Sequence, residues 1–228
     1  MHGVWKERGK IAEGWKRILP VLGALEENSS LQDALEEALR QDGDVRGKSF
    51  VGESIEALEG QTLDFSGCRF ERCSFSELDF GRLSFVDCVF EKCELSNLRI
   101  TSAAFQRVRF VNCRMTGMEC MRGALMSVAF EDCMMDYLSL SECKLDRVIF
   151  SGCRLRESLW ADVKMPKARF QNTDLSRAQW MRTPLSGMDL STCQIAGWNV
   201  SLFDLKGAKV TAAQVIELSG LLGVEIVS

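Results

Sequence analysis

Cysteine is the residue type in this sequence most suited to chemistry, because a thiolate can act as a nucleophile, a redox centre or a metal ligand. The chain has ten cysteines and a single histidine, His2. The pairs Cys68/Cys73 and Cys88/Cys93 are spaced CxxxxC, and no CxxC pair typical of zinc or iron–sulfur sites occurs. With His2 as the only histidine, Cys–His and Ser–His catalysis are not expected. We therefore expect no catalytic residue, no metal, no cofactor and no enzyme activity.

The cysteines follow a repeat of five residues. Every fifth residue from Phe65 to Val210 gives thirty consecutive positions, which are all apolar and include eleven phenylalanines. All cysteines but Cys120 lie two residues before one of these positions, in a second, mostly small set, and Cys120 lies in the large set itself. The other three positions of each unit are mostly polar. Each cysteine therefore follows the core pattern, and we interpret it as a small buried apolar residue.

A period of five matches neither regular helix nor regular strand. Five residues advance a helix by about 500°, which would scatter the large residues around it. A flat strand would send them to alternate faces. The large residues share one facing only if the chain turns a corner in each unit, so the pattern predicts a coiled chain filled by its inward side chains.

A longer spacing indicates how many units make one turn of the coil. Residue type persists at a separation of 20, as expected if like side chains stack in adjacent turns of four units. Two columns show this persistence: Phe70, Phe90, Phe110, Phe130, Phe150 and Phe170, and Cys73, Cys93, Cys113, Cys133 and Cys153.

The repeat resembles that of the pentapeptide-repeat family, whose motif is A(D/N)Lxx centred on Leu or Phe. Examples in this chain are Cys68-Arg69-Phe70-Glu71-Arg72 and Thr173-Asp174-Leu175-Ser176-Arg177. The resemblance implies an all-β solenoid, a right-handed, four-sided parallel β-helix of about 7.5 coils, roughly 36 Å long at the usual strand spacing. The chain departs from the motif in using Cys and Val where Ala is commonest.

The two ends depart from the repeat and predict caps. Residues 1–44 are interpreted as an N-terminal helical segment, with a first helix between Trp5 and Leu22. A second helix has a capping box from Ser29 to Gln32, an apolar stripe, and Gly43 after its end. The stripe consists of Leu31, Ala34, Leu35, Ala38 and Leu39.

Residues 45–62 are interpreted as a degenerate first turn, with Phe50 and Ile55 in register and Gly60 in the next slot. Residues 63–212 form the β-helix. Residues 213–228 predict a capping helix, containing Val215, Ile216, Leu218, Leu221 and Leu222, and a short strand from Val224 to Val227. The resemblance also implies that this end can mediate a homodimer.

Two sets of outward residues are candidates for binding. Apolar residues at outward positions could form a partner surface, and the alternative is scattered exposed side chains. Basic residues stacked 20 apart could form an anion patch, although Asp146 lies among them. The apolar set consists of Met121, Met126, Met134, Tyr137, Leu159 and Met181, together with Ile149, and the basic set of Lys144, Arg147, Lys164 and Lys167.

The charge balance and the free thiols bear on location and partners. The net charge is −4, from 28 basic and 32 acidic residues, so we expect no direct binding of nucleic acid. No apolar run approaches the roughly 18 residues of a membrane span, and we do not expect membrane binding although the first predicted helix is basic. Buried thiols suit a reducing compartment, so a cytoplasmic location is expected.

Two functions compete. The first is a non-catalytic protein-binding or scaffolding module of a bacterial cell, whose protein partner the sequence does not identify. The second is implied by the resemblance to Qnr-type and MfpA-type proteins: a DNA mimic that binds a type II topoisomerase, DNA gyrase or topoisomerase IV, and modulates quinolone sensitivity. Mimicry of DNA requires an acidic surface, but on no side of the predicted rod do acidic residues exceed basic ones by more than one. We favour the binding module.

Overall fold

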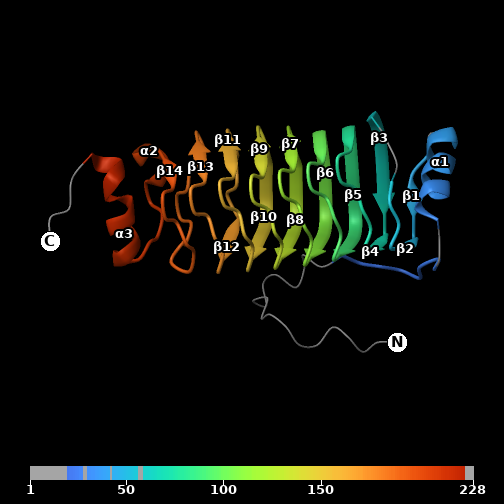
Figure 1. Ribbon diagram of the computed structural model, residues 1–228, viewed down its shortest axis with the longest axis horizontal. Coiled ribbons are helices and arrows are strands. Elements are labelled where there is room, and N and C mark those ends of the chain that lie inside the picture. The colour runs from blue at the N-terminus through green and yellow to red at the C-terminus, as the bar shows by residue number, and fades with distance from the viewer. Residues whose placement is uncertain (1–19, 28–29, 42, 56–58, 224–228) are drawn as a thin grey trace.

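The protein is a parallel β-solenoid of about eight turns with a small helix at each end. The structure is a computed structural model that describes residues 20–27, 30–41, 43–55 and 59–223. Figure 1 shows the strands stacked side by side along the long axis, with α1 at one end and α2 and α3 at the other. The predicted all-β solenoid is confirmed.

The strands are short except where they bend around a corner of the coil. The elements are α1 (Leu31–Gln41), β1 (Val45–Arg46), β2 (Ser49–Val51), β3 (Glu59–Ser66), β4 (Arg69–Glu71), β5 (Asp79–Glu91), β6 (Arg99–Val111), β7 (Glu119–Met121), β8 (Ala124–Glu131), β9 (Ser139–Ser141), β10 (Lys144–Ser151), β11 (Leu159–Ala161), β12 (Arg169–Gln171), β13 (Gln179–Met181), β14 (Asn199–Val200), α2 (Leu202–Leu205), α3 (Ala212–Leu218) and the 3-10 helix η2 (Ser219–Leu222).

The register between neighbouring coils is 20 residues. Phe70 of β4 pairs with Phe90 of β5, and Phe90 pairs with Phe110 of β6, in parallel. The prediction of four units per turn is therefore confirmed. The four sides are named here by their order along the chain: the first side contains Phe65, the second Phe70, the third Phe75 and the fourth Phe80.

The corners of the coil use a backbone conformation that the repeat pattern did not reveal. The residue two places after the large inward residue has a positive φ in most units, for example 53° at Asp87, 56° at Asn97 and 52° at Arg107. In the part of the chain that the structure describes, eighteen residues other than glycine adopt this left-handed conformation at the corners. It is uncommon for such residues. The turn at each corner is what keeps every fifth side chain pointing inward.

The core is a column of stacked rings inside the second side. The ring centroids of Phe110 and Phe130 are 5.1 Å apart, those of Phe130 and Phe150 are 4.9 Å apart, and those of Phe150 and Phe170 are 4.8 Å apart. These stacked rings are nearly parallel, with interplanar angles of 5° or 6°. All ten cysteines are buried beside the large residues and form no disulfide. The fold is held mainly by burial of this continuous apolar column.

At the N-terminal end, α1 packs on the first coil through the predicted stripe. Leu31, Ala34, Leu35 and Ala38 are buried in the core, whereas Leu39 is 39% exposed. The observed N-cap is Ser30, whose hydroxyl accepts a hydrogen bond from the N–H of Asp33 at 3.2 Å. Ser29, which we expected to cap the helix, lies outside the described residues.

Most of the first predicted helix also lies outside the described residues. Its last predicted residue, Leu22, falls in the segment 20–27, which contains no helix. Pro20 and Gly23 both disfavour a helix there. The N–H of Val21 instead donates to the carboxylate of Asp87 at 3.0 Å, so this segment runs along the solenoid.

Near Gly60, expected to interrupt the first turn, the pairing of β3 with β5 shifts register.

At the C-terminal end, α3 satisfies the backbone of the last complete coil. The side-chain amide of Gln214 donates to the carbonyls of Leu190 and Cys193, each at 2.8 Å. Gln214 also forms a capping box with Thr211. These bonds cover acceptors that an open solenoid end would leave exposed. The strand predicted over Val224 to Val227 lies outside the described residues.

Candidate functional site

The cysteines form buried columns that run along the solenoid. The thiol of Cys113 donates weak hydrogen bonds to the carbonyls of Phe90, at 3.6 Å, and Val111, at 3.5 Å. Thr173, two coils after Cys133 in the same column, uses its hydroxyl in the same way, toward the carbonyls of Phe150 and Gln171. The small inward residue therefore helps to join successive coils. No group of three metal-binding side chains occurs in the part of the chain that the structure describes.

The surroundings of Cys113 and Cys193 hold these two thiols protonated. Hydrogen bonding to Cys133 and burial raise the pKa of Cys113 to about 12. Burial also raises the pKa of Cys193, in the last complete coil. At neutral pH these groups are thiols and not thiolates, and a thiol is a poor nucleophile.

The apolar candidates are spread over three sides. Met121, Leu159 and Met181 lie on the fourth side, Met134 on the third, Tyr137 at the corner between these sides, and Met126 on the first side. Met121, Met126, Tyr137 and Met181 are exposed, whereas Met134 and Leu159 are half-buried.

The fourth side brings three of these candidates together. Met121 pairs with Ser141, Ser141 with Ala161, and Ala161 with Met181, so the two methionines flank two small residues in one column. Leu159 lies two residues before Ala161 along β11. Met121 is 48% exposed and Met181 is 43% exposed. We call Met121, Ser141, Leu159, Ala161 and Met181 the fourth-side strip.

One outward apolar residue is not part of any surface. Ile149, at an outward position in the repeat, is only 5% exposed. It lies in register between Ala129 and Arg169 on the second side, and Ala129 and Val89 of the same column are also buried. The prediction that Ile149 faces solvent is wrong, because its side chain is buried together with those of Ala129 and Val89 in the same column.

The four basic candidates divide into two pairs. Lys144 and Lys164 face each other across neighbouring coils on the first side. Arg147 and Lys167 lie at the corner between the first and second sides, where both approach the carboxylate of Asp146, at 2.7 Å and 3.8 Å. Asp146 therefore offsets part of the charge of the patch.

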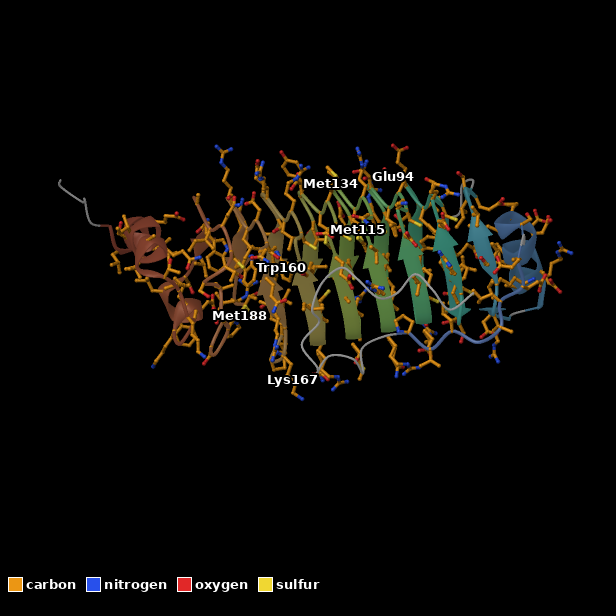
Figure 2. The ribbon with its side chains drawn as sticks, turned by 90° about the horizontal axis from the view of Figure 1, so that it is seen from below. Glu94, Met115, Met134, Trp160, Lys167 and Met188 are labelled. Atoms are coloured by element: carbon orange, nitrogen blue, oxygen red, sulfur yellow. The ribbon has the colours of Figure 1, made fainter. Side chains whose placement is uncertain are left out.

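A cleft of about 960 Å³ opens beside this corner. Arg147 and Lys167 line it, but Lys144 and Lys164 do not. The sequence analysis did not predict the other polar residues of the cleft. The two prolines of the repeat, Pro166 and Pro184, are the sequence feature that could have indicated it. The further lining residues are Pro166, Ala168, Arg169, Phe170, Gln171, Gly187, Met188, Asp189, Ser191, Thr192 and Lys209. Figure 2 shows Lys167 at the lower edge of the solenoid, opposite Met134 and Glu94.

Charges on the outer surface are interleaved between coils. Arg109 and Glu131 form two hydrogen bonds of 2.6 Å, and Arg107 reaches Asp87 one coil earlier at 2.6 Å and 2.5 Å. Such pairs neutralise one another locally, and within the described coils no side presents a continuous row of carboxylates. No helix in the described ranges is long and apolar enough to cross a bilayer.

The coil geometry and the five-residue repeat define a class of proteins, the parallel β-solenoids built from pentapeptide units. The chain matches the pentapeptide repeat region over residues 63–132 and 103–180, just over half of its length. It belongs to the pentapeptide-repeat family. No curated protein matches the sequence.

Several solved structures are similar to the chain. A trypsin-treated variant of QnrB1, a plasmid-mediated fluoroquinolone resistance protein, has 19% sequence identity and a TM-score of 0.35, and the match covers 81% of this chain and 100% of that one. HetL, a pentapeptide repeat protein involved in heterocyst differentiation regulation from the cyanobacterium Nostoc sp. strain PCC 7120, has 12% identity and a TM-score of 0.29, with coverage of 82% and 90%.

Proposed function

We propose that this protein is a non-catalytic protein-binding or scaffolding module. The observation that supports this function best is the fourth-side strip, in which two exposed methionines and Leu159 flank small residues on a rigid ladder. Methionine side chains adapt to varied apolar partners, and exposed apolar groups gather at protein interfaces. The free, buried thiols are consistent with a cytoplasmic location.

The test is affinity capture from the source cell with matched variants. The double variant Met121→Glu/Met181→Glu places two charges on the strip, and Val51→Glu places one on an equally exposed apolar position of β2. A partner that uses the strip is retained by the wild type and by Val51→Glu and is lost with the double variant. Identical captured proteins in all three samples would contradict this role.

The second candidate is binding to a type II topoisomerase as a DNA mimic, which would modulate quinolone sensitivity. Family membership and the rod shape favour it, and the interleaved ion pairs such as Arg109–Glu131 oppose it, because they remove the acidic surface that mimicry requires. A gyrase supercoiling assay with and without a quinolone separates the candidates. Inhibition or rescue at micromolar protein would favour topoisomerase binding over our first proposal.

The C-terminal cap supports a homodimer in either case. Phe203 is 82% exposed, and four further apolar residues of the cap are also exposed: Leu202, Val215, Ile216 and Leu222. Light scattering after size exclusion is expected to give a dimer mass for the wild type and a monomer mass for Phe203→Glu/Ile216→Glu. A monomer mass for the wild type at high micromolar concentration would contradict the dimer.

A further inference from the structure

The segment 20–27 leads the chain onto the second side of the solenoid. The N–H of Glu26 donates to the carbonyl of Gly47 at 2.8 Å, so this end of the segment lies beside the first coil. Five residues earlier, the N–H of Val21 donates to Asp87, which holds the corner position of Gly47 two coils further along. Figure 1 shows the segment in dark blue along the lower edge of the solenoid, between β2 and β5. Followed toward the N-terminus, the chain therefore runs along the corner between the first and second sides, toward later coils.

The second side carries an apolar row at outward positions. Val89, Arg109, Ala129 and Ile149 stand in register on four successive coils. The three apolar residues among them, in chain order, are only 4%, 2% and 5% exposed. We call these four residues the second-side row. The row begins on the coil that Val21 contacts.

Equivalent positions on other sides are more exposed. Ala124 directly precedes the large inward residue of its unit on the first side and is exposed, whereas Ala129, in the same place on the second side, is buried. Leu159 holds this place on the fourth side and is half-buried, whereas Ile149 is buried. Outward side chains stand away from the backbone of their strand. The low exposure is therefore a property of the second side and not of the position in the repeat.

Neighbours within the row account for only part of this burial. Arg109 forms two hydrogen bonds with Glu131, one coil later, and this pair lies beside Ala129. Ile149 lies between Ala129, which is small, and Arg169, which is exposed. A small neighbour and an exposed one do not bury an isoleucine. We therefore looked for another part of the chain that reaches the row.

The chain that precedes the segment 20–27 has the length and the pattern to cover the row. The apolar residues of positions 1–19 recur at spacings typical of one helix face, and Pro20 would end such a helix. At a rise of about 1.5 Å per residue, this apolar stripe would be about 20 Å long. The row spans three coil steps, about 14 Å at the usual strand spacing. The stripe consists of Trp5, Ile11, Trp15 and Ile18.

We propose that residues 5–19 pack as an amphipathic helix along the second-side row of the same molecule. The apolar stripe would face Val89, Ala129 and Ile149, and burial of apolar surface on both partners would drive the contact. The opposite face of the helix would remain in water, because it carries charged residues. These are Lys6, Lys10, Glu13 and Arg17.

The direction of the segment 20–27 also sets the direction of the helix. Ile18 would lie near Val89, and Trp5 would lie at or beyond Ile149. The second side would then be occupied along these coils, and partners would meet the other three sides. The fourth-side strip lies on the opposite side of the coil, so this inference does not depend on the proposed function. A second copy of the chain is the alternative occupant of the row.

The first test asks what lies on the row in the full chain. With p-benzoylphenylalanine in place of Trp15, irradiation joins the helix to its neighbours, and mass spectrometry locates the joined peptides. We expect a product of monomer mass on a denaturing gel, with cross-links to the second side between Val89 and Ile149. The same label in place of Met121, on the fourth side, is the control and should not join to residues 1–19. Cross-links to another side, no cross-link, or a product of dimer mass would overturn the proposal.

The second test uses the tryptophans of the helix as probes of its burial. The wild type has five tryptophans, and the two in the helix are Trp5 and Trp15. The other three are buried in the core, so they contribute little to quenching by acrylamide: Trp160, Trp180 and Trp198. If the helix packs on the row, acrylamide should quench the wild type only weakly. Quenching of Trp5 and Trp15 as strong as that of free tryptophan would contradict the packing.

Variants of the row sharpen this measurement. Ile149→Glu places a charge in the row and should raise the quenching constant at least threefold, because the helix is released. Leu159→Glu places the same charge at the equivalent position of the fourth side and should change the constant by less than 1.5-fold. Far-UV circular dichroism unchanged from the wild type is the folding control. Equal effects of the two variants would overturn the proposal.

A final variant assigns the signal to the helix. In the background Trp5→Phe/Trp15→Phe the responding residues are absent, so Ile149→Glu should leave the quenching constant unchanged. An increase in this background would place the effect in the core tryptophans and would contradict the proposal. The strip variant Met121→Glu/Met181→Glu should leave the quenching of the wild type unchanged, so failure of this inference and failure of the proposed function are distinguishable.

Discussion

The coils from Phe65 to Phe170 and the last coils before α3 have the same five-residue repeat but different hydrogen bonding. In the first region every strand of the second side pairs with both neighbours until β12. The phenylalanine column is continuous there, with centroid distances from 4.5 Å to 5.1 Å between Phe70 and Phe170. In the second region the column continues as Leu190 and the ladder to β12 is absent.

The difference separates burial from strand pairing. Leu185 and Leu190 are fully buried although their coil is unpaired with the preceding one on the second side. Apolar residues in register are enough to fill the coil, because the hydrophobic effect has no direction. A ladder needs in addition an N–H at each donor position, and proline removes it. The same repeat can therefore form either a closed wall or a cleft.

The tryptophans show a second contrast between the two regions. The indole N–H of Trp160 donates to the hydroxyl of Ser158 at 3.0 Å. Trp180 packs against Trp160 one coil later, with centroids 4.8 Å apart and the rings tilted by 31°, but Ala178 replaces the serine. The indole N–H of Trp180 is buried without a partner. The indole N–H of Trp198, in the same region, is also buried without a partner, so the two regions differ in how their indoles are hydrogen-bonded.

The largest effect is expected from a cavity in the continuous column. Phe110→Ala removes a fully buried ring between Phe90 and Phe130 and should lower the free energy of unfolding by about 3–5 kcal/mol, measured by chemical denaturation. Val21→Ala, at a side chain that is 73% exposed and outside the proposed interfaces, is the control and should change it by less than about 0.5 kcal/mol. Similar losses in both variants would show that the column is not the main source of stability.

A proline placed in the intact region should reproduce the interruption. Lys144 holds the position of Pro184 two coils earlier and donates its N–H to Gly123 at 2.8 Å. Lys144→Pro leaves that carbonyl unpaired, so we expect a loss of about 1–3 kcal/mol in the free energy of unfolding. Lys144→Ala keeps the N–H and should be near neutral. A loss as large for Lys144→Ala would trace the effect to the side chain and refute the ladder argument.

The thiols offer a measure of local opening in the two regions. Cys193 lies beyond the interruption, whereas the other nine cysteines precede it. The last coils should open more readily, because they are held by fewer strand pairs. We therefore expect iodoacetamide to label Cys193 roughly tenfold faster than Cys113. This ratio corresponds to a difference of about 1.4 kcal/mol in the free energy of local opening. Mass spectrometry of tryptic peptides at pH 8 gives both rates. Pro184→Ala should reduce the difference between the labelling rates of Cys193 and Cys113. Equal labelling rates in the wild type would argue against a less stable C-terminal region.

The smallest effect concerns the unpaired indole. Ala178→Ser supplies Trp180 with the hydroxyl that Ser158 supplies to Trp160, and should raise the free energy of unfolding by about 1 kcal/mol. Ala103→Ser is the control, because Ala103 precedes Phe105, whose ring has no donor, and it should destabilise the protein. Destabilisation by both serines would mean that the site beside Trp180 has no room for a hydroxyl.

Much of the fold followed from residue spacing, and less of the surface did. The five-residue period and the persistence at 20 residues predicted the coil and its register, and both are confirmed. The stripe of α1 was predicted, but Leu39 is exposed. Whether Met121 or Lys167 binds a partner stays a prediction. The exposure predicted for Ile149 was wrong, because the exposure of an outward side chain depends on the side chains around it. The repeat leaves those residues free to vary.

The sequence by itself determined the interior of this protein: which residues point inward, how the coils align, and that cysteine is a packing residue here. These properties depend on residues at fixed short separations, which the chain carries in plain order. Only the tertiary structure decided where the wall opens. The cleft depends on which N–H groups of one coil meet which carbonyls of the coil before it. Its cations come from positions as distant as Arg147 and Lys209. Pro184 is visible in the sequence as a residue without an N–H. The loss of that donor affects the structure only where a carbonyl of the preceding coil would have accepted its hydrogen bond.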